Sequence, residues 1–425
     1  MLSATLSLYA QDGAYTNFTP YSIFAVGELS SPGSAYNAGM GGVGIATRNK
    51  RYVNILNPAS VTARDSLSFM SSMSLHSTNK AFSQSDMTYV NNTFNVNEVV
   101  ISFPIYRSSA VMLGMAPYSG TGYSYAASTD DPKIIESTQG MNYSSAGKGG
   151  VHQLFAAGGV TFWKRLSLGA EYIAYFGRIE RASNLTFVGS GYSSVRNGSN
   201  LTLRGSAAKF GMQYEQPLGG GMTLGIGGTY KMKAGMRGYA EDYKLAVGSA
   251  QSDTLRYRMD TLKLNRGLSY APEIGVGISL NANDRWRAEV DYIRSDWTKS
   301  GVATTTGFAV SGKTVFGTTI AEALRAGFEI TPNRNDIRYY YRRCTYRAGA
   351  YWNKSYYTLD NHPVHAIGIT LGGTLPVLNN YNGLTFAIDI GQRGTKVDGM
   401  IRERYVNFTI GLNYLDYWFR KPHYE

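Results

Sequence analysis

Ionisable side chains recur at alternate positions in segments that otherwise carry apolar and small residues. A lysine or arginine placed this way could bind the carboxylate of an amphiphilic ligand while large apolar residues hold its tail. The alternative is mutual pairing, or hydrogen bonding to the N-terminal part of the chain, because a buried charge without a partner is costly. The sequence leaves both interpretations open. The residues of the first interpretation are Phe155, Ile173, Tyr175, Lys231, Lys233 and Arg325, and the remaining ionisable members are Glu171, Glu273, Arg287, Glu289, Asp291, Glu329 and Asp389.

Two short motifs resemble metal or cofactor sites. His362 and His365 flank Pro363 near Asp360, but imidazoles so arranged are poorly set to converge on one ion. The glycines of 39–44 have the spacing of a dinucleotide loop without its strand, helix and later acidic residue. We therefore expect no metal and no cofactor. The sequence also has no G-x-S-x-G motif and no evident nucleophile–histidine pairing, so we expect no enzyme activity.

Composition narrows the class of protein. The 425 residues include 41 Lys+Arg and 29 Asp+Glu, a net charge of +12, and 16% are charged; soluble domains usually carry about 25%. No basic run concentrates the charge, so we expect no nucleic-acid partner and favour outer-membrane lipid and lipopolysaccharide. The mean hydropathy of -0.23 and the lack of any run of about 18 apolar residues exclude a helical membrane protein. The single cysteine, Cys344, excludes a disulfide framework.

The elements that would position the ionisable side chains are strands. In 405–414 the apolar residues hold every even position, and 384–391 and 222–233 repeat this alternation. A period of two is typical of a sheet with one apolar face. Small and charged residues share the less apolar face and aromatics lie at the strand ends, which favours an all-β, antiparallel transmembrane β-barrel. We predict about fourteen strands, at 66–76, 96–106, 109–118, 151–163, 165–178, 202–215, 221–233, 267–281, 285–295, 320–331, 344–354, 363–375, 382–392 and 405–417.

The connections between these strands alternate in length. The connections 77–95, 119–150 and 179–201 are long, whereas 107–108 and 216–220 are short. Outer-membrane barrels have short periplasmic turns and longer external loops. The alternation therefore predicts a barrel in the bacterial outer membrane, with both termini in the periplasm.

The stretch 34–60 is too rich in glycine for a stable helix and too irregular for a strand. Glycine permits close approach of other groups, and proline fixes the turn that ends the stretch. We interpret it as a plug, or hatch, inside the barrel, formed around Gly39, Gly41, Gly42, Gly44, Asn57, Pro58 and Ala59. The predicted division is a signal-peptide remnant at 1–10, an N-terminal segment and plug at 11–65, the barrel at 66–419 and a periplasmic tail at 420–425.

The plug with Asn57-Pro58-Ala59, followed by alternating strands, resembles the FadL/TodX outer-membrane transporters of hydrophobic compounds. The N-terminal motifs 21–24 and 27–29 and the ending 416–421 look like the branch found in Bacteroidota. The resemblance implies an N-terminal hatch and a kinked third strand that opens the wall sideways. Gly114 and Pro117 are the residues expected at such an opening, because proline cannot donate to the ladder.

The last predicted strand ends in aromatic residues. Tyr414, Trp418 and Phe419 resemble the terminal signal that barrel-assembly machinery recognises. Aromatic residues also suit the membrane interface, so packing and signal interpretations coexist.

These features lead to a functional expectation and one alternative. We expect passive uptake of hydrophobic small molecules, of fatty-acid-like or aromatic type, with lateral release into the membrane. The alternative is an accessory subunit of an outer-membrane protein-assembly or secretion complex, with other outer-membrane proteins as partners. A plug disfavours a plain porin for polar solutes.

Overall fold

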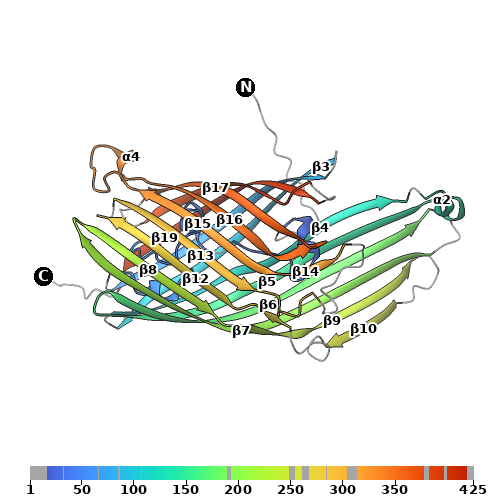
Figure 1. Ribbon diagram of the computed structural model, residues 1–425, viewed down its shortest axis with the longest axis horizontal. Helices are drawn as coiled ribbons and strands as arrows, with labels where there is room; N and C mark the ends of the chain where they lie inside the picture. Colours follow the sequence, from blue (N-terminus) through green and yellow to red (C-terminus); the bar gives the residue numbers. More distant parts are fainter. Residues whose placement is uncertain are drawn as a thin grey trace, which may run out of the picture.

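The computed structural model describes residues 17–31, 33–65, 67–84, 87–106, 108–129, 131–188, 193–247, 254–260, 268–283, 285–303, 314–377, 382–396 and 400–418. Within them, fourteen antiparallel strands form a closed β-barrel (Figure 1). These strands are β2 (Ser68–Gln84), β3 (Met87–Tyr106), β4 (Ser109–Ser128), β5 (Met141–Phe162), β6 (Leu166–Phe187), β7 (Ser194–Gly219), β8 (Met222–Lys231), β12 (Glu273–Ala282), β13 (Trp286–Asp296), β15 (Ile320–Ile330), β16 (Thr345–Leu359), β17 (His362–Pro376), β18 (Gly383–Arg393) and β19 (Arg402–Tyr417).

The barrel closes where the last strand meets the first. β19 pairs antiparallel with β2 from Tyr417 opposite Ser68 to Arg402 opposite Ser83. Four further strands continue or flank the wall, namely β9 (Ala234–Val247), β10 (Thr254–Asp260), β11 (Ser269–Tyr270) and β14 (Phe316–Thr318). The predicted fold class is thereby confirmed.

Alternation along each strand separates two environments. On β19, Phe408, Ile410 and Leu412 are exposed on the outer face, whereas Thr409 and Asn413 are buried inside. The wall thus turns a continuous apolar face outward, as a lipid-facing barrel requires. None of the helices in the described chain is both long and apolar enough to cross a bilayer.

Several strands extend well beyond their predicted ends. β4 continues past residue 118 to Ser128, β5 begins at Met141 rather than 151, and β6 reaches Phe187. These extensions lie on the side of α2 (Pro132–Thr138), at the right-hand end of the barrel in Figure 1. We call this side the loop end. The added residues are largely polar or small, so no apolar alternation marked them as strand.

The opposite side, the turn end, carries tight connections at 163–165, 220–221 and 283–285. The connection 331–344 is the exception, because it contains the short helix α4 (Tyr340–Arg343). Residues 332–343, which lie between two of the predicted strands, therefore form a structured loop.

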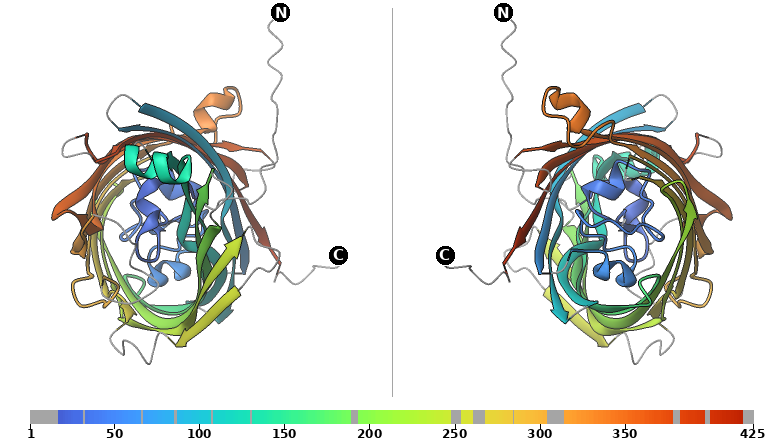
Figure 2. Two further views of the ribbon diagram at one scale, coloured as in Figure 1. Left: turned by 90° about the vertical axis from the view of Figure 1, so that its right-hand side faces the viewer. Right: turned by 90° about the vertical axis from the view of Figure 1, so that its left-hand side faces the viewer.

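The N-terminal segment lies inside the barrel, where both end-on views show it within the ring of strands (Figure 2). It contains the 3-10 helices η1 (Pro20–Ile23) and η2 (Pro58–Thr62), the strand β1 (Glu28–Leu29) and the helix α1 (Ala35–Ala38). We call residues 17–65, of which the structure describes all but 32, the hatch. Its position agrees with the predicted plug. Residues 1–16 and 419–425, which include the predicted signal remnant and tail, lie outside the described part of the chain.

Candidate functional site

Two carboxylates of β13 hold the backbone of the hatch. Asp291 Oδ2 accepts hydrogen bonds from the N–H groups of Gly44, at 2.7 Å, and Ile45, at 3.0 Å. Glu289 accepts from the N–H of Ala46 at 2.8 Å and from the Thr47 hydroxyl. Hydrogen bonds to charged acceptors are the stronger kind. Part of the predicted lumen charge therefore binds the hatch, as the second interpretation of these residues requires.

The predicted hatch glycines lie where the hatch backbone meets the barrel wall or itself. A Cβ on Gly41 would lie 2.7 Å from the Ala326 carbonyl oxygen, and Gly41 has φ +71. Gly39 faces Gly372, Gly42 faces Arg325, and Gly44 faces Asn37 within the hatch. The glycine-rich stretch thus serves close packing.

Asn57 connects the end of this stretch to the wall. Its side chain accepts from the N–H of Ala59 and so caps η2, which begins at Pro58. Its Nδ2 donates to Ile45 O at 2.8 Å and to Met212 O, on β7, at 3.2 Å. One side chain therefore organises the local turn and fixes it to the barrel.

Two arginines of the wall contact hatch aromatics near the turn end. Arg347 forms an ion pair with Glu329 at 2.8 Å and lies over the rings of Tyr36 and Tyr52, 4.4 and 5.1 Å from their centroids. Arg287 donates to the Tyr36 hydroxyl. Burial raises the pKa of Tyr36, so its hydroxyl stays protonated. Tyr36, Tyr52 and Arg347 were not singled out from the sequence, because nothing local marks which aromatic will meet a charge.

Hatch arginines complete the anchoring. Arg48 Nε contacts Glu215 Oε2 at 3.0 Å, and burial lowers the pKa of its guanidinium. Burial also lowers the pKa of Arg64, to about 10. Arg64 donates to Val61 O within the hatch and to the hydroxyl of Ser102 on β3. Arg48 therefore ties the hatch to β7, and Arg64 ties it to β3.

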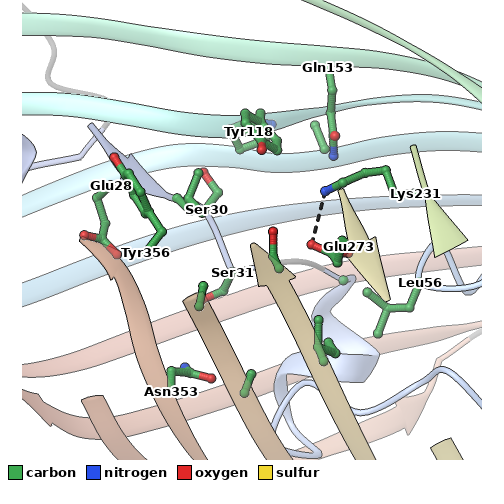
Figure 3. A pocket seen from close by; sticks show the side chains of 18 of the residues that line it. Glu28, Ser30, Ser31, Leu56, Tyr118, Gln153, Lys231, Glu273, Asn353 and Tyr356 are labelled. Atoms are coloured by element: carbon green, nitrogen blue, oxygen red, sulfur yellow. Dashed lines mark hydrogen bonds and ion pairs between the residues drawn. The ribbon is translucent and has the colours of Figure 1, made fainter. Parts of the chain in front are cut away.

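Above this anchored base lies a cavity of about 230 Å³, lined by both wall and hatch (Figure 3). Lys231 and Glu273 point toward one another across it, with Nζ and Oε2 3.1 Å apart. Lys209 and Glu171 form a second, looser pair at 4.0 Å. Arg325 also lines the cavity and donates to Gly42 O. The predicted basic residues Lys231 and Arg325 thus line the cavity, but each already has a partner.

Lys233 requires a correction. The alternation placed it on the lumen face with Lys231, but Met232 and Lys233 are both exposed at the break between β8 and β9, and Ala234 is buried. A register shift of one residue at this break changes which alternate positions face the lumen, from odd-numbered residues in β8 to even-numbered residues in β9. Lys233 is not among the residues that line either cavity.

An aromatic cluster adjoins the same cavity. The rings of Tyr118, Tyr175 and Tyr270 contact one another with centroids 4.7 to 4.9 Å apart. Trp297 packs at a tilt against Tyr356, with ring centroids 4.5 Å apart. Within the described residues, Trp297 Nε1 and the hydroxyls of Tyr175 and Tyr270 are buried without a hydrogen-bond partner. The predicted apolar residues Phe155 and Ile173 line the cavity, and Tyr175 lies in the adjoining cluster.

The wall is interrupted between β3 and β4. The two strands pair only from Tyr106 opposite Ser109 to Val99 opposite Met115. Beyond that point β3 pairs with β2, whereas β4 pairs with β5 and, at Ser119 and Gly120, with β1 of the hatch. We call this interruption the seam. A register shift after Pro117 bends β4 where it leaves β3.

A second cavity, of about 300 Å³, lies against the seam. Met115, Ala116, Pro117, Val96 and Asn97 line it. Residues 28–31 of the hatch, Ala116 and Pro117 also line the first cavity, so the two adjoin across them. Gly114 and Pro117, the two residues predicted at a lateral opening, therefore both lie near the seam. Gly114 is on the paired part of β4, where a Cβ would clash with the Phe155 ring.

Asn97 marks the seam on β3 and was missed by the sequence analysis. A register shift between Ser74 and Leu75 leaves Asn97 without a paired residue on β2. Its side chain donates to Gly33 O of the hatch at 3.0 Å. The adjacent polar residues 97–98, which break the alternation, were the available signal.

The remaining predicted residues lie away from the cavities. Trp418 stacks on Phe69 with centroids 4.0 Å apart, and Trp418 and Tyr414 both donate to Asp416. Phe419 lies outside the described residues. No group of three or more His, Cys, Asp or Glu side chains in the described ranges is arranged to hold a metal.

Comparisons with known proteins agree with this architecture. A family model described as BamG matches residues 1–425. The toluene transporter TodX of P. putida has 14% identity and a TM-score of 0.60, over 91% of this chain and 99% of that one. TbuX, the toluene transporter of Ralstonia pickettii, has 15% identity and a TM-score of 0.59, over 89% and 97%. A FadL homologue of Pseudomonas aeruginosa has 12% identity and a TM-score of 0.59, over 93% and 99%. No curated protein sequence matches.

Proposed function

Because this chain belongs to the BamG family and is an outer-membrane barrel with the fold of the FadL/TodX transporters, we propose that it admits small hydrophobic molecules through the outer membrane. The titles of the TodX and TbuX structures describe toluene transporters. We propose the same broad class of cargo here, aromatic or long-chain apolar compounds. The loop end faces outside and the turn end faces the periplasm.

The observation that carries the proposal is the seam with a cavity behind it. A strand crosses the apolar core of a bilayer with about 9–11 residues, and the β3–β4 ladder spans only 99–106 on β3. The seam then begins at the depth of the membrane core. A molecule in the second cavity would leave between Val96 and Ala116, and its transfer into lipid is downhill by about 25 cal/mol per Å² of apolar surface.

The first cavity supplies the holding site in this proposal. Phe155, Ile173 and the aromatic cluster would contact the apolar body of the cargo. Trp297, with a buried N–H that lacks an acceptor in the described chain, favours a cargo with a hydrogen-bond acceptor. Lys231 would meet a carboxylate only by leaving Glu273, so a neutral cargo fits better than an anionic one.

The test is transfer of a fluorescent apolar compound into the bilayer of proteoliposomes. Ala116 is buried at the seam, and Ala116→Trp should reduce transfer at least several-fold by filling the exit. The matched control is Leu113→Trp, on the same strand but exposed to lipid, which should transfer like the wild type. Equal transfer rates in all three proteins would rule out lateral exit at the seam. Transfer no faster than in protein-free liposomes, for every protein, would rule out transport altogether.

The second candidate is an accessory subunit of a protein-assembly or secretion complex. The observation that favours it is the internal neutralisation of the lumen, where Lys231, Lys209 and Arg393 are each paired with a glutamate. The identity to the transporter structures is only 12–15%, so the shared fold does not by itself select the transporter. Purification in a gentle detergent followed by mass spectrometry separates the candidates. Stoichiometric outer-membrane partners would favour the subunit, and a lone barrel carrying apolar compounds would favour the transporter.

A further inference from the structure

One connection at the turn end differs from the tight turns around it. Residues 331–344, which we call the basic loop, contain four arginines and one acidic residue, together with three consecutive tyrosines. Ile337 is fully exposed, and Tyr339, Tyr340 and Tyr341 are each more than a third exposed. Charged and aromatic residues thus share one surface of the loop.

The loop is ordered by its own contacts. Asp336 accepts from the N–H groups of Arg338 and Tyr339 and forms an ion pair with Arg342 at 3.3 Å. Tyr340 donates to Pro376 O, which ties α4 to the end of β17. The one acidic residue is therefore used inside the loop and does not neutralise its outer surface.

Three guanidinium groups of the loop lie over tyrosine rings. Arg338 and Arg342 cover Tyr339 with separations of 5.1 and 4.8 Å, and Arg343 covers Tyr340 at 5.0 Å. A cation–π contact holds each guanidinium beside its ring. Arg342 is also paired with Asp336, and Arg343 Nε is buried without a hydrogen-bond partner in the described residues. Arg338 has an exposed side chain with no acidic partner in the described chain.

The position of the loop indicates what it meets. In both end-on views α4 lies outside the ring of strands (Figure 2), and Figure 1 places it at the turn end beside β17. The neighbouring outward residues Phe328, Ile330, Tyr346 and Leu371 are apolar or aromatic and exposed. A segment displaced outward at this level overlies the lipid headgroups beside the lipid-facing band, where tyrosine and arginine are the favoured residues.

We propose that the basic loop binds the phosphate groups of anionic phospholipids in the periplasmic leaflet. Arg338 and Arg343 donate to the phosphate, since the guanidinium fork matches its oxygens. Ile337 inserts at the boundary between headgroups and acyl chains. The loop thereby fixes the depth of the barrel at β15–β17, which β18, β19, β2 and β3 separate from the seam. This proposal does not depend on the transport proposal.

The experiment compares lipid binding by the full-length protein and two double variants. Arg338→Gln/Arg343→Gln removes two phosphate donors and keeps the Arg342–Asp336 pair that orders the loop. The matched control, Arg165→Gln/Arg285→Gln, removes the same charge from exposed positions in two short turns of the same rim. Phosphatidylglycerol and phosphatidylcholine are titrated into detergent-solubilised protein, and bound lipid is counted by native mass spectrometry.

We expect phosphatidylglycerol to bind the loop variant about tenfold more weakly than the wild type. The control variant should bind phosphatidylglycerol like the wild type. All three proteins should bind phosphatidylcholine equally. Equal losses in both variants would show a general effect of rim charge and would overturn the assignment. Unchanged phosphatidylglycerol binding by the loop variant would also overturn the assignment, even if that variant had lost a protein partner.

A second measurement probes the apex of the loop. An environment-sensitive fluorophore on Ile337→Cys should emit at shorter wavelength after reconstitution into phosphatidylglycerol vesicles than in detergent-free buffer with amphipol. The unsubstituted protein is the labelling control, because Cys344 is buried. Water-like emission in vesicles would place the apex away from lipid and contradict the proposal.

Discussion

Asp291 Oδ2 lies 2.7 Å from the backbone nitrogen of Gly44, so a wall carboxylate holds the hatch by its main chain. The same oxygen accepts from Ile45, whereas Oδ1 has no hydrogen-bond partner in the described chain. A single carboxylate oxygen, Oδ2, therefore accepts both hydrogen bonds from the hatch backbone. The hatch backbone at this point has no strand partner of its own, and the carboxylate replaces one.

Removing this acceptor should loosen the hatch. Asp291→Ala leaves two buried N–H donors unsatisfied, and we expect a local destabilisation of about 3 kcal/mol. Asp291→Asn keeps an acceptor oxygen and should change much less. Hydrogen exchange of peptides covering 40–48 measures the effect. Asp389→Ala, which removes a lumen carboxylate bound to Tyr351 and Asn407, should leave that exchange unchanged, and equal protection in all variants would contradict the anchoring role.

Asn57 should control leakage through the barrel. Asn57→Ala removes the cap of η2, worth about 1 kcal/mol, and also the donors to Ile45 and Met212. We expect more frequent conducting events in planar bilayers, and a still larger leak when residues 34–60 are deleted. Asn57→Asp keeps the cap and loses the donors, so it should be intermediate. An Asn57→Ala protein as tight as the wild type would show that the turn is not needed for the seal.

A disulfide across β1 and β4 should lock the hatch strand beside the seam. Leu29 and Ser119 are antiparallel partners, and such pairs have Cα atoms about 4.5–5.5 Å apart, within disulfide range. In Leu29→Cys/Ser119→Cys, oxidation should slow transfer of apolar compounds and reduction should restore it. The single variants under the same oxidant are the controls. Undiminished transfer in the cross-linked protein would show that β1 stays in place during passage.

The role of the terminal aromatics can be divided between packing and assembly. Trp418→Ala and Phe69→Ala remove the same stacked pair, worth about 1 kcal/mol, but only the first changes the C-terminal residues. If the end of the chain is an assembly signal, Trp418→Ala should lower the amount of folded barrel in cells more than Phe69→Ala does. Heat-modifiable migration on gels measures this amount. Equal yields would leave only the packing role.

Acid should release the basic loop. The N–H of Tyr339 donates to Asp336 and lowers the pKa of that carboxyl below its usual value. The stabilisation is therefore complete at neutral pH and is lost as the pH falls through the lowered pKa. Hydrogen exchange of 333–343, corrected for intrinsic rates, should rise in that range. Asp336→Asn should exchange faster at neutral pH and show no such transition.

The sequence alone determined the wall of this protein. Alternation such as that of 405–414 depends only on neighbouring positions in one chain segment, so the fourteen strands could be found without knowing their partners. The glycines of 39–44 and the turn at Asn57 likewise indicated a compact segment that no strand or helix could form. The alternation failed where strands left the lipid, because polar residues on both faces give no periodic signal.

Only the tertiary structure decided what the lumen charges do. The pairing of Lys231 with Glu273, and of Asp291 with the hatch backbone, joins residues 42 and 247 positions apart. The exposure of Lys233 follows from one register shift, and a shift of one residue moves every later side chain to the other face. The seam likewise exists because β4 exchanges β3 for β1 of the hatch. Such pairings depend on contacts between distant segments, which a local pattern does not contain.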